Sequence, residues 1–388
     1  MLWQPSLPDK YTQMTDEQLV AAITARRAQL GGDLVILGHH YQQDEVIRFA
    51  DFAGDSFLLS QLAARQVQRV GAKYVIFCGV HFMAESADVL TPDDVAVILP
   101  DLSAGCSMAD MADYDQTVDA WEQIEPLIDG GRIIPVCYMN SSAAIKAFCG
   151  EHGGAVCTSS NCQRVFQWAL AGGTQPKRDG ESIRILFLPD EHLGRNTAYA
   201  MDVPLDRMPL YDPFEIDGAI TPEQFADARV ILWKGFCSVH GEFNVDQIEK
   251  IRSEDPAVNV IVHPECTFDV VQAADDSGST SKIVKVIEAA EPGSSWAVGT
   301  EINLIKRLAE QVKDKNINVR SLSGKACPCS TMYRIDLPHL TWIMQKVTQH
   351  SQDPSTTLPN QIKVDPETRK WAKLALDRMM DISAQAAL

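Results

Sequence analysis

Cysteines recur in this chain at matching distances from polar side chains that could support chemistry. His39 and Cys106 are 67 residues apart, and His263 and Cys329 are 66 residues apart. Counting from His263 to Cys327 gives 64, so Cys329 is the better match. This spacing indicates repeated copies of one supersecondary plan, each ending in a cysteine.

A middle copy runs from Tyr138 to Cys237, a distance of 99 residues. Its surplus falls in the Pro- and Asp-rich stretch 198–227, which we interpret as a surface insertion. With that correction, the sequence predicts three copies whose cysteines are Cys106, Cys237 and Cys329. Copies facing one another around a pseudo-threefold axis would bring these cysteines together.

Three thiolates, one from each copy, suit a metal centre, and thiolates are the usual ligands of iron–sulfur clusters. Three ligands would leave one iron of a four-iron cluster open to bind substrate oxygens as a Lewis acid. Zinc is an alternative that the missing C-x-x-C spacing disfavours. Another alternative is that all ten cysteines are buried structural thiols, the role we assign to Cys327 and the remaining six.

Polar groups follow the first predicted strand of each copy. They are His39, His40 and Tyr41, then Tyr138 and Asn140, then His263 and Glu265. We expect Glu265 to transfer protons, because a carboxylate enclosed near a metal can have its pKa tuned towards working pH. For a single histidine, a purely structural role is the more common one.

Three loops of small residues, GDS (54–56), TSSN (158–161) and GSTS (278–281), stand at predicted helix starts. Free backbone N–H groups and the helix dipole there favour carboxylate or phosphate. Ordinary N-capping is the alternative explanation.

Short apolar runs alternate with helical segments, as in parallel βαβ units covered on both faces. The predicted strands are 34–37, 74–77, 95–99, 133–136, 183–188, 229–234, 259–262, a short run near 296, and 317–322. A capping box at Thr15 predicts an entry helix up to Leu30, and residues 43–54 predict a helix ending at Gly54. The fold class is therefore α/β.

The chain has 388 residues and a formal charge of −18, which argues against nucleic-acid or anionic-membrane partners. The N-terminus lacks a basic start and an apolar core, and no run approaches a membrane span. We expect a cytoplasmic protein. The expected segments are a first domain (1–112), a second with the insertion (113–242), a third (243–335), and C-terminal helices packing back on the body (336–388).

The chain resembles the quinolinate synthase family of bacterial NAD biosynthesis from about Leu34 to the C-terminal helix. The motifs that carry the resemblance are GHHYQQDEV, GDS, GVHFMAESADVL, CYMNSSAAIKA, CTSSN, LPDEHLGR, WKGFCSVHGEF, VHPE, GSTSKI and CSTMYRIDLPHL. The resemblance implies three homologous three-layer αβα domains around one central [4Fe-4S] cluster. The cluster ligands would be Cys106, Cys237 and Cys329.

The resemblance also implies a reaction, in which iminosuccinate and dihydroxyacetone phosphate give quinolinate, phosphate and two waters, with a coupling to L-aspartate oxidase. It places proton transfer on Glu265 and associates Tyr41 with the chemistry, and His263, Tyr138 and His39 complete the expected catalytic set. The implied substrate-binding positions are His39, Ser56, Tyr138, Met139, Asn140, Ser159, His263, Pro264, Glu265, Ser279 and Thr280.

Two other functions compete with this one. Another iron–sulfur dehydratase would use the same open iron on a different hydroxy acid. A non-enzymatic protein would hold a closed structural metal or carry electrons, and would need a fourth protein ligand. The motif PDEHLG offers His192, to which the sequence assigns no role.

Overall fold

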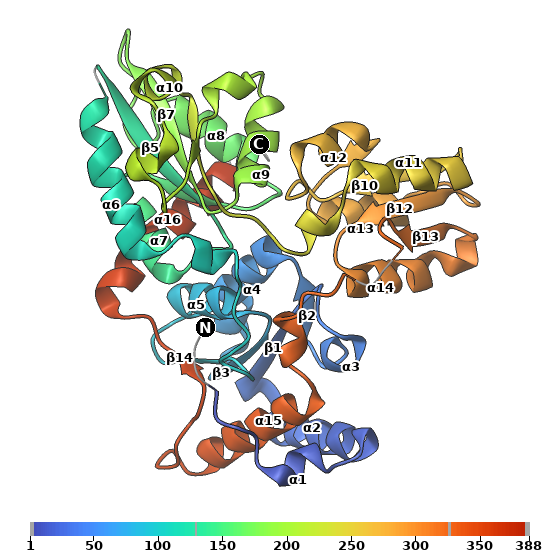
Figure 1. Ribbon diagram of the computed structural model, residues 1–388. Coiled ribbons are helices and arrows are strands. Elements are labelled where there is room, and N and C mark those ends of the chain that lie inside the picture. The colour runs from blue at the N-terminus through green and yellow to red at the C-terminus, as the bar shows by residue number, and fades with distance from the viewer. Residues whose placement is uncertain (1–3, 129, 325–326, 385–388) are drawn as a thin grey trace. The chain divides into compact units, whose positions relative to one another are not determined.

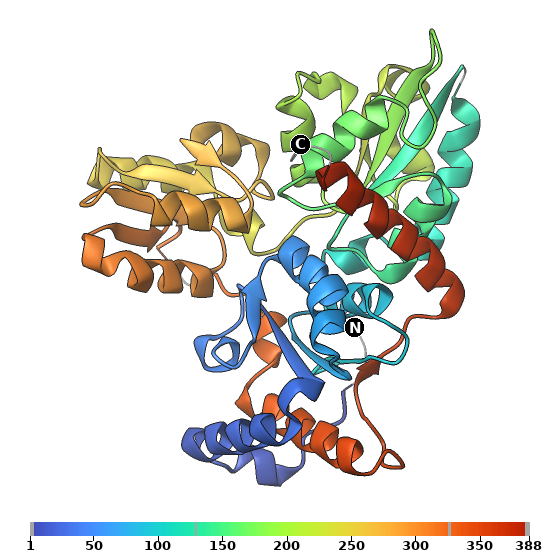
Figure 2. The same ribbon diagram turned by 180° about the vertical axis from the view of Figure 1, so that it is seen from behind.

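A computed structural model describes residues 4–128, 130–324 and 327–384 of the chain. The fold is α/β, with three mostly parallel sheets flanked by helices (Figures 1 and 2), which confirms the predicted class. The chain divides into two compact units. The first unit joins residues 1–106 to 328–365, and the second joins 107–327 to 366–388. The residue boundaries expected for the individual domains stay predictions.

The first unit holds one sheet with the strand order β14-β4-β3-β1-β2, in which only β14 is antiparallel. Its strands are β1 (Leu34–His39), β2 (Phe52–Gly54), β3 (Tyr74–Cys78), β4 (Ala96–Ile98) and β14 (Gln361–Ile362). Its helices are α1 (Asp9–Thr12), α2 (Asp16–Leu30), α3 (Asp44–Ile47), α4 (Ser56–Val70), α5 (His81–Leu90) and α15 (Leu337–Gln352). The capping box predicted at Thr15 is present.

The second unit holds two sheets, the first of which has the order β6-β5-β7-β9-β8. Its strands are β5 (Gly131–Tyr138), β6 (Ala155–Cys157), β7 (Ser182–Leu188), β8 (Leu210–Tyr211) and β9 (Val230–Trp233). The accompanying helices are α6 (Tyr114–Ile124), α7 (Ala143–Glu151), α8 (Cys162–Leu170), α9 (Glu191–Tyr199) and α10 (Pro222–Asp227). The predicted insertion contains β8 and α10.

The other sheet of the second unit has the order β11-β10-β12-β13 and is parallel throughout. Its strands are β10 (Asn259–Val262), β11 (Asp276–Ser277), β12 (Ser295–Gly299) and β13 (Asn318–Ser321). The helices around it are α11 (Val245–Glu254), α12 (Phe268–Ala273), α13 (Thr280–Glu288) and α14 (Ile302–Val312).

The repeat predicted from the cysteine spacing is present in the topology. Four parallel strands follow the same order in each sheet, namely β2-β1-β3-β4, β6-β5-β7-β9 and β11-β10-β12-β13. The first and third copies also share one hydrogen bond between an aspartate and the first strand. The Asp51 carboxylate accepts a hydrogen bond of 2.8 Å from the Ile36 N–H, and the Asp275 carboxylate accepts one of 2.8 Å from the Val260 N–H.

Each copy also contains a short second strand that the sequence does not signal. These strands, β2, β6 and β11, have three, three and two residues. The helix predicted to reach Gly54 was wrong: α3 ends at Ile47, and Phe52–Gly54 pair with Leu37–His39 in β1. Pairing with a neighbouring strand decides the conformation of segments this short, whatever their local preference.

The C-terminal helix α16 (Pro366–Ala384) packs along α7 in the second unit. Glycine at position 150 allows the approach, because a Cβ there would lie 2.0 Å from the Trp371 carbonyl oxygen. Arg378 donates to the carbonyl oxygens of Gly150 and Gly154 at 2.9 and 2.7 Å. The helix is therefore fixed by both packing and polar contacts.

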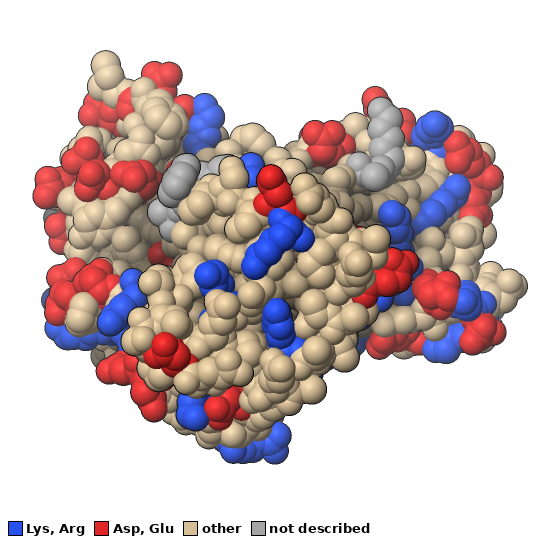
Figure 3. Space-filling view, turned by 90° about the horizontal axis from the view of Figure 1, so that it is seen from below, with Lys and Arg blue, Asp and Glu red and all other residues tan. Residues whose placement is uncertain are grey.

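On the face drawn in Figure 3, Lys and Arg side chains lie singly or in small groups among Asp and Glu side chains. Within the described ranges, every helix is too short or too polar to cross a membrane.

Candidate functional site

The predicted site residues fall in both units, and each unit is described by itself. The first unit contains His39, Tyr41, Ser56, Cys106 and Cys329. The second unit contains Tyr138, Met139, Asn140, Ser159, Cys237, His263, Pro264, Glu265, Ser279 and Thr280.

His39 ends strand β1 and is almost fully buried. Its Nδ1 atom accepts a hydrogen bond of 3.1 Å from the Tyr41 backbone N–H, and the Tyr41 ring packs edge-on against the imidazole at 4.7 Å. Because Nδ1 accepts, the neutral ring carries its proton on Nε2. The loop therefore fixes both the orientation and the tautomer of His39.

Two polar contacts in the first unit fix the loops that carry Cys106 and Cys329. Arg334 donates to the Ser103 hydroxyl at 2.9 Å, and that hydroxyl donates to the buried Asp101 carboxylate at 2.6 Å. Ser103 lies three residues before Cys106, and Arg334 lies five residues after Cys329. The contacts therefore connect the two cysteine loops.

Glutamines from the loop after β1 support the segment after Cys329. The fully buried Gln42 donates through Nε2 to the Met332 carbonyl at 3.2 Å, and Gln43 donates to the Tyr333 carbonyl at 3.1 Å. These contacts explain how residues 328–335 pack with the first copy rather than with β13, which precedes them in the sequence.

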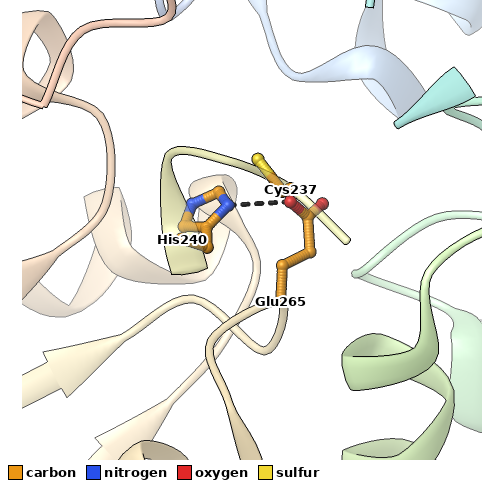
Figure 4. A group of neighbouring side chains, drawn as sticks. All are labelled: Cys237, His240 and Glu265. Carbon is orange, nitrogen blue, oxygen red and sulfur yellow. Dashed lines mark hydrogen bonds and ion pairs between the residues drawn. The ribbon is translucent and has the colours of Figure 1, made fainter. Parts of the chain in front are cut away.

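In the second unit, Cys237, His240 and Glu265 form one cluster (Figure 4). Their candidate ligand atoms all lie within 4.8 Å of one another. The Nδ1 atom of His240 is 2.7 Å from Glu265 Oε2, and its Nε2 atom is 3.2 Å from the Thr300 hydroxyl. Both side chains are almost completely buried. A carboxylate, an imidazole and a hydroxyl thus form a continuous hydrogen-bonded chain beside a cysteine.

His263 adds a second imidazole to this cluster. Its ring stacks on that of His240 with centroids 4.4 Å apart and an angle of 20° between the planes. Its Nδ1 atom accepts from the Glu265 backbone N–H at 3.3 Å, which leaves the proton of the neutral ring on Nε2. Burial lowers the pKa of His263 to about 3 despite the nearby Glu265 charge. His263 is therefore neutral at physiological pH.

Glu265 is held as a carboxylate, and its pKa is shifted away from working pH rather than towards it as predicted. Burial alone would raise its pKa, but the interactions with His263 and His240 and the hydrogen bonds from His240 and Tyr138 outweigh burial and lower that pKa. The neighbouring Asp190 behaves oppositely, because burial and the charge of Glu265 raise its pKa well above the ordinary value. Two carboxyl groups with opposite pKa shifts are a common feature of acid–base sites.

Among the described residues, several buried polar atoms of the second copy have no hydrogen-bond partner. They are Asn140 Oδ1, Asp190 Oδ2, His192 Nδ1 and Asn196 Oδ1. Because burying an unpaired polar atom is costly, such atoms point to an absent binding partner. Asn140 was predicted to bind substrate, whereas Asp190 and His192 come from the motif to which no role was assigned.

The small-residue loops differ in how they begin their helices. In α13 Ser279 is itself the N-cap, since its hydroxyl accepts from the Lys282 N–H at 3.3 Å. In α4 the cap is Asp55, which leaves Ser56 at the first helical position. In α8 Asn161 Oδ1 accepts from the Thr158 N–H at 2.7 Å, and Ser159 is half-buried. Capping therefore engages Ser279 but not Ser56 or Ser159.

A cavity of about 600 Å³ joins loops from two copies within the second unit. Its lining includes Ser159 from the second copy and Pro264 and Gly278 from the third. The predicted convergence of polar loops is thus seen for these two copies. Two other predicted residues are buried. Met139 directly follows β5, and Thr280 is the first residue of α13.

The cysteines differ in accessibility. Cys106, Cys237 and Cys329 are all partly exposed, so their thiolates are accessible to a metal centre. Six others are buried: Cys78, Cys137, Cys149, Cys157, Cys162 and Cys266. Cys327 is partly exposed, but it packs against the apolar core around β10 and lies 3.4 Å from the Ser323 hydroxyl. The three predicted ligands therefore fit a thiolate-bound group.

Cys237, His240 and Glu265 could instead hold a single metal ion. The 2.7 Å between His240 Nδ1 and Glu265 Oε2 is a hydrogen-bond distance, and His240 Nε2 is also engaged by Thr300. Both ring nitrogens of His240 are therefore already engaged in hydrogen bonds. This arrangement favours an acid–base pair beside a cysteine.

Several residues that contact the predicted site residues or their loops were not predicted from the sequence. They are Gln42, Asp101, Asn196, His240 and Arg334. For His240 a signal exists, since it follows Cys237 by three residues in GFCSVHG. Pairing of the polar loops across copies is a tertiary property and has no local signature.

Comparison with known proteins gives consistent matches along the chain. Residues 21–381 match the model of the family described as "Quinolinate synthetase A protein". A quinolinate synthase from Listeria innocua is 50% identical over 384 residues, covering 98% of both chains. Those from Nocardioides sp. and Acidobacterium capsulatum are 50% and 48% identical, covering 98% and 96% of this chain and 93% and 95% of their own.

Proposed function

Because the chain belongs to the quinolinate synthetase A protein family, we propose that it is an enzyme of NAD biosynthesis that makes quinolinate. The proposed substrates are iminosuccinate and dihydroxyacetone phosphate, and the other products are phosphate and two waters. The observation that carries the proposal is the buried Glu265–His240 pair beside Cys237, since condensation and dehydration both require positioned proton donors and acceptors.

We propose that Cys106, Cys237 and Cys329 hold one [4Fe-4S] cluster per chain. Their partial exposure supports this assignment, in contrast to the six buried cysteines. A three-cysteine cluster would supply an iron that acts as a Lewis acid and assists the loss of hydroxyl groups.

Glu265 is the proposed proton acceptor, because the structure keeps it ionised in a buried setting. His240 can take up or release a proton at Nδ1 against Glu265 while the Thr300 hydroxyl holds its other nitrogen. His263 Nε2 would donate a hydrogen bond to a substrate oxygen as charge develops, whereas the Tyr138 hydroxyl would donate to Glu265 and accept a hydrogen bond from the substrate. In the first unit, His39 and Tyr41 would likewise donate hydrogen bonds or transfer protons.

The substrates carry carboxylates and a phosphate, which need hydrogen-bond donors from the protein. Ser159 and Ser56 are proposed to provide hydroxyls and backbone N–H groups at helix starts, together with Asn140, Ser279 and Thr280. Met139 and Pro264 would shape the walls against the carbon chain. Burial of Glu265 and His263 would also exclude water from iminosuccinate, which hydrolyses readily.

We place this activity in the cytoplasm, downstream of an L-aspartate oxidase that supplies the short-lived iminosuccinate. Neither nucleic acid nor membrane is a proposed partner.

The test is an anaerobic assay of the purified protein with dihydroxyacetone phosphate and iminosuccinate generated in place by an aspartate oxidase. Iron content is measured on the same sample. We expect about four irons per chain and quinolinate formation. A full complement of iron without quinolinate would refute the function and favour another iron–sulfur dehydratase. Zinc in place of iron would refute the proposed cofactor.

A further inference from the structure

Asn196, on helix α9 of the second copy, contacts the loop that carries Glu265 in the third. The side chain is 7% exposed. Its Nδ2 atom donates to the Pro264 carbonyl and to the Cys266 carbonyl, both at 2.9 Å. One amide therefore uses both of its hydrogens on the carbonyls immediately before and after Glu265.

The rest of the turn is held from within its own copy, where the His263 N–H donates to the Gly299 carbonyl at the end of β12 at 3.0 Å. The Glu265 N–H donates to His263 Nδ1 at 3.3 Å, and the Cys266 N–H donates to the His263 carbonyl at 3.0 Å. These bonds define the turn and attach it to its own sheet. Asn196 attaches its main chain to the second copy, and beside Asn196 the Tyr199 and Phe268 rings pack edge to face at 4.8 Å.

Displacement of this turn would move the Glu265 carboxylate away from His240 Nδ1, which is 2.7 Å away. Proton transfer requires heavy atoms within about 2.6–3.2 Å. Without Asn196 the buried carbonyls of Pro264 and Cys266 would also lose their donor, so the turn would shift to find another.

We infer that Asn196 is a positioning residue: its side-chain amide holds the carbonyl groups of the residues on either side of Glu265 and so aligns the carboxylate with His240. This inference rests on the proposed function of Glu265. It makes the contact between α9 and the His263–Cys266 turn a part of the catalytic apparatus, although Asn196 need not touch substrate.

The test combines kinetics with a double-mutant cycle. In Asn196→Ala we expect kcat to fall about 30- to 100-fold, as for a misplacement near 1 Å, with KM changed less than about threefold. In the Glu265→Gln background the same substitution should lower kcat less than about twofold, because the carboxylate it aligns is gone. An equal loss in both backgrounds, or no loss in either, would overturn the inference.

Two further variants separate positioning from folding. Asn196→Leu keeps the size and branching of the side chain but removes both donors, and it should reproduce the loss if Asn196→Ala fails to fold. Asn259→Ala is the matched control, since its amide donates to the Ser295 carbonyl at 3.3 Å at the opposite end of β10. We expect its kcat to equal that of the wild type. A comparable loss in Asn259→Ala would indicate general destabilisation and overturn the inference.

A crystal structure of Asn196→Leu gives a readout without turnover. We expect the distance from Glu265 to His240 to increase beyond hydrogen-bonding range, and an unchanged 2.7 Å contact would overturn the inference. If the wild type forms no quinolinate, the proposed function fails, and this structure still decides whether Asn196 positions Glu265.

Discussion

The loops that follow β1 and β10 have the same backbone design but support different chemistry. A histidine is the last residue of β1 and the first residue after β10, and in each loop its Nδ1 accepts from the N–H two residues later, at 3.1 Å for His39 and 3.3 Å for His263. That later residue is Tyr41 in one loop and Glu265 in the other. The first loop then reaches the segment after Cys329 through Gln42, whereas the third reaches His240, near Cys237, through Glu265.

One loop scaffold can therefore serve two tasks through the residues that follow its histidine. In the first unit, the Gln42 amide fixes a cysteine-bearing segment. In the third copy, the Glu265 carboxylate, at the place equivalent to Tyr41, pairs with His240. We therefore expect substitutions in the third loop to affect chemistry most and those in the first loop to affect cluster retention and stability.

The largest effect should come from Glu265→Gln. Removal of the carboxylate should lower kcat about 10²- to 10⁴-fold, the range for loss of a general acid–base group, while iron content stays at the wild-type level. Tyr41→Phe, at the equivalent position of the first loop, should cost less. Steady-state assays of both variants test the contrast, with the exposed Glu242→Gln as a control. A Glu265→Gln variant as active as the control would remove the distinction between the loops.

Gln42→Met should weaken the hold of the first loop on the Cys329 segment. The fully buried amide would be lost and the Met332 carbonyl would lose this donor, so unfolding should become easier by about 1–3 kcal/mol. We expect faster bleaching of the cluster in air and a kcat within about tenfold of the wild type. Gln345→Met, which removes the acceptor of the Tyr11 hydroxyl, is the matched control. Equal bleaching rates in the two variants would contradict the assignment.

Lowering the pH should destabilise the protein through His263. Its folded pKa of about 3 lies below the ordinary value of 6.5, so the unfolded state binds more protons between these values. Its contribution to the free energy of unfolding is complete above pH 6.5 and is lost as the pH falls towards 3, by at most about 1.4 kcal/mol per pH unit. The pKa of Glu265 is lowered and that of Asp190 is raised, so these two groups contribute to the pH dependence with opposite signs.

Denaturant unfolding of the wild type and His263→Gln between pH 6.5 and 4.5 isolates the histidine. We expect a shallower dependence of stability on pH in the variant. Identical slopes would mean that His263 is not held neutral by burial.

The smallest effects should be those of Asp51→Asn and Asp275→Asn, which alter the same bond in the two copies. Each carboxylate accepts from a strand N–H and pairs with an arginine, Arg27 or Arg252. We expect a similar loss of about 1–2 kcal/mol in each, measured by thermal or denaturant unfolding. Unlike losses would show that the copies share geometry but not energetics.

Much of the fold could be predicted because it repeats. The long apolar strands around Ile36, Val75, Ile185 and Val260 have strong local signals, and the cysteine spacing relates the copies to one another. The short strands β2, β6 and β11 could not be found, since two or three residues carry too little pattern and their pairing with the first strand of each copy decides their conformation.

For the candidate site, residue types at strand ends identified His39, Tyr138, His263 and Glu265. The partners of these residues were harder to find. His240 was missed although it lies close to Cys237, because its importance comes from a contact with Glu265, 25 residues later. Asn196 lies 68 residues before Pro264 and has no sequence signal, as its role depends on the packing of two sheets.

The account rests on Cys329, rather than its neighbour Cys327, being the third member of the metal centre. Iron per chain in anaerobically purified Cys329→Ala and Cys327→Ala tests this directly. We predict that Cys329→Ala loses the cluster and forms no quinolinate, whereas Cys327→Ala keeps about four irons and most of its activity. Loss of iron from Cys327→Ala with retention in Cys329→Ala would contradict the account.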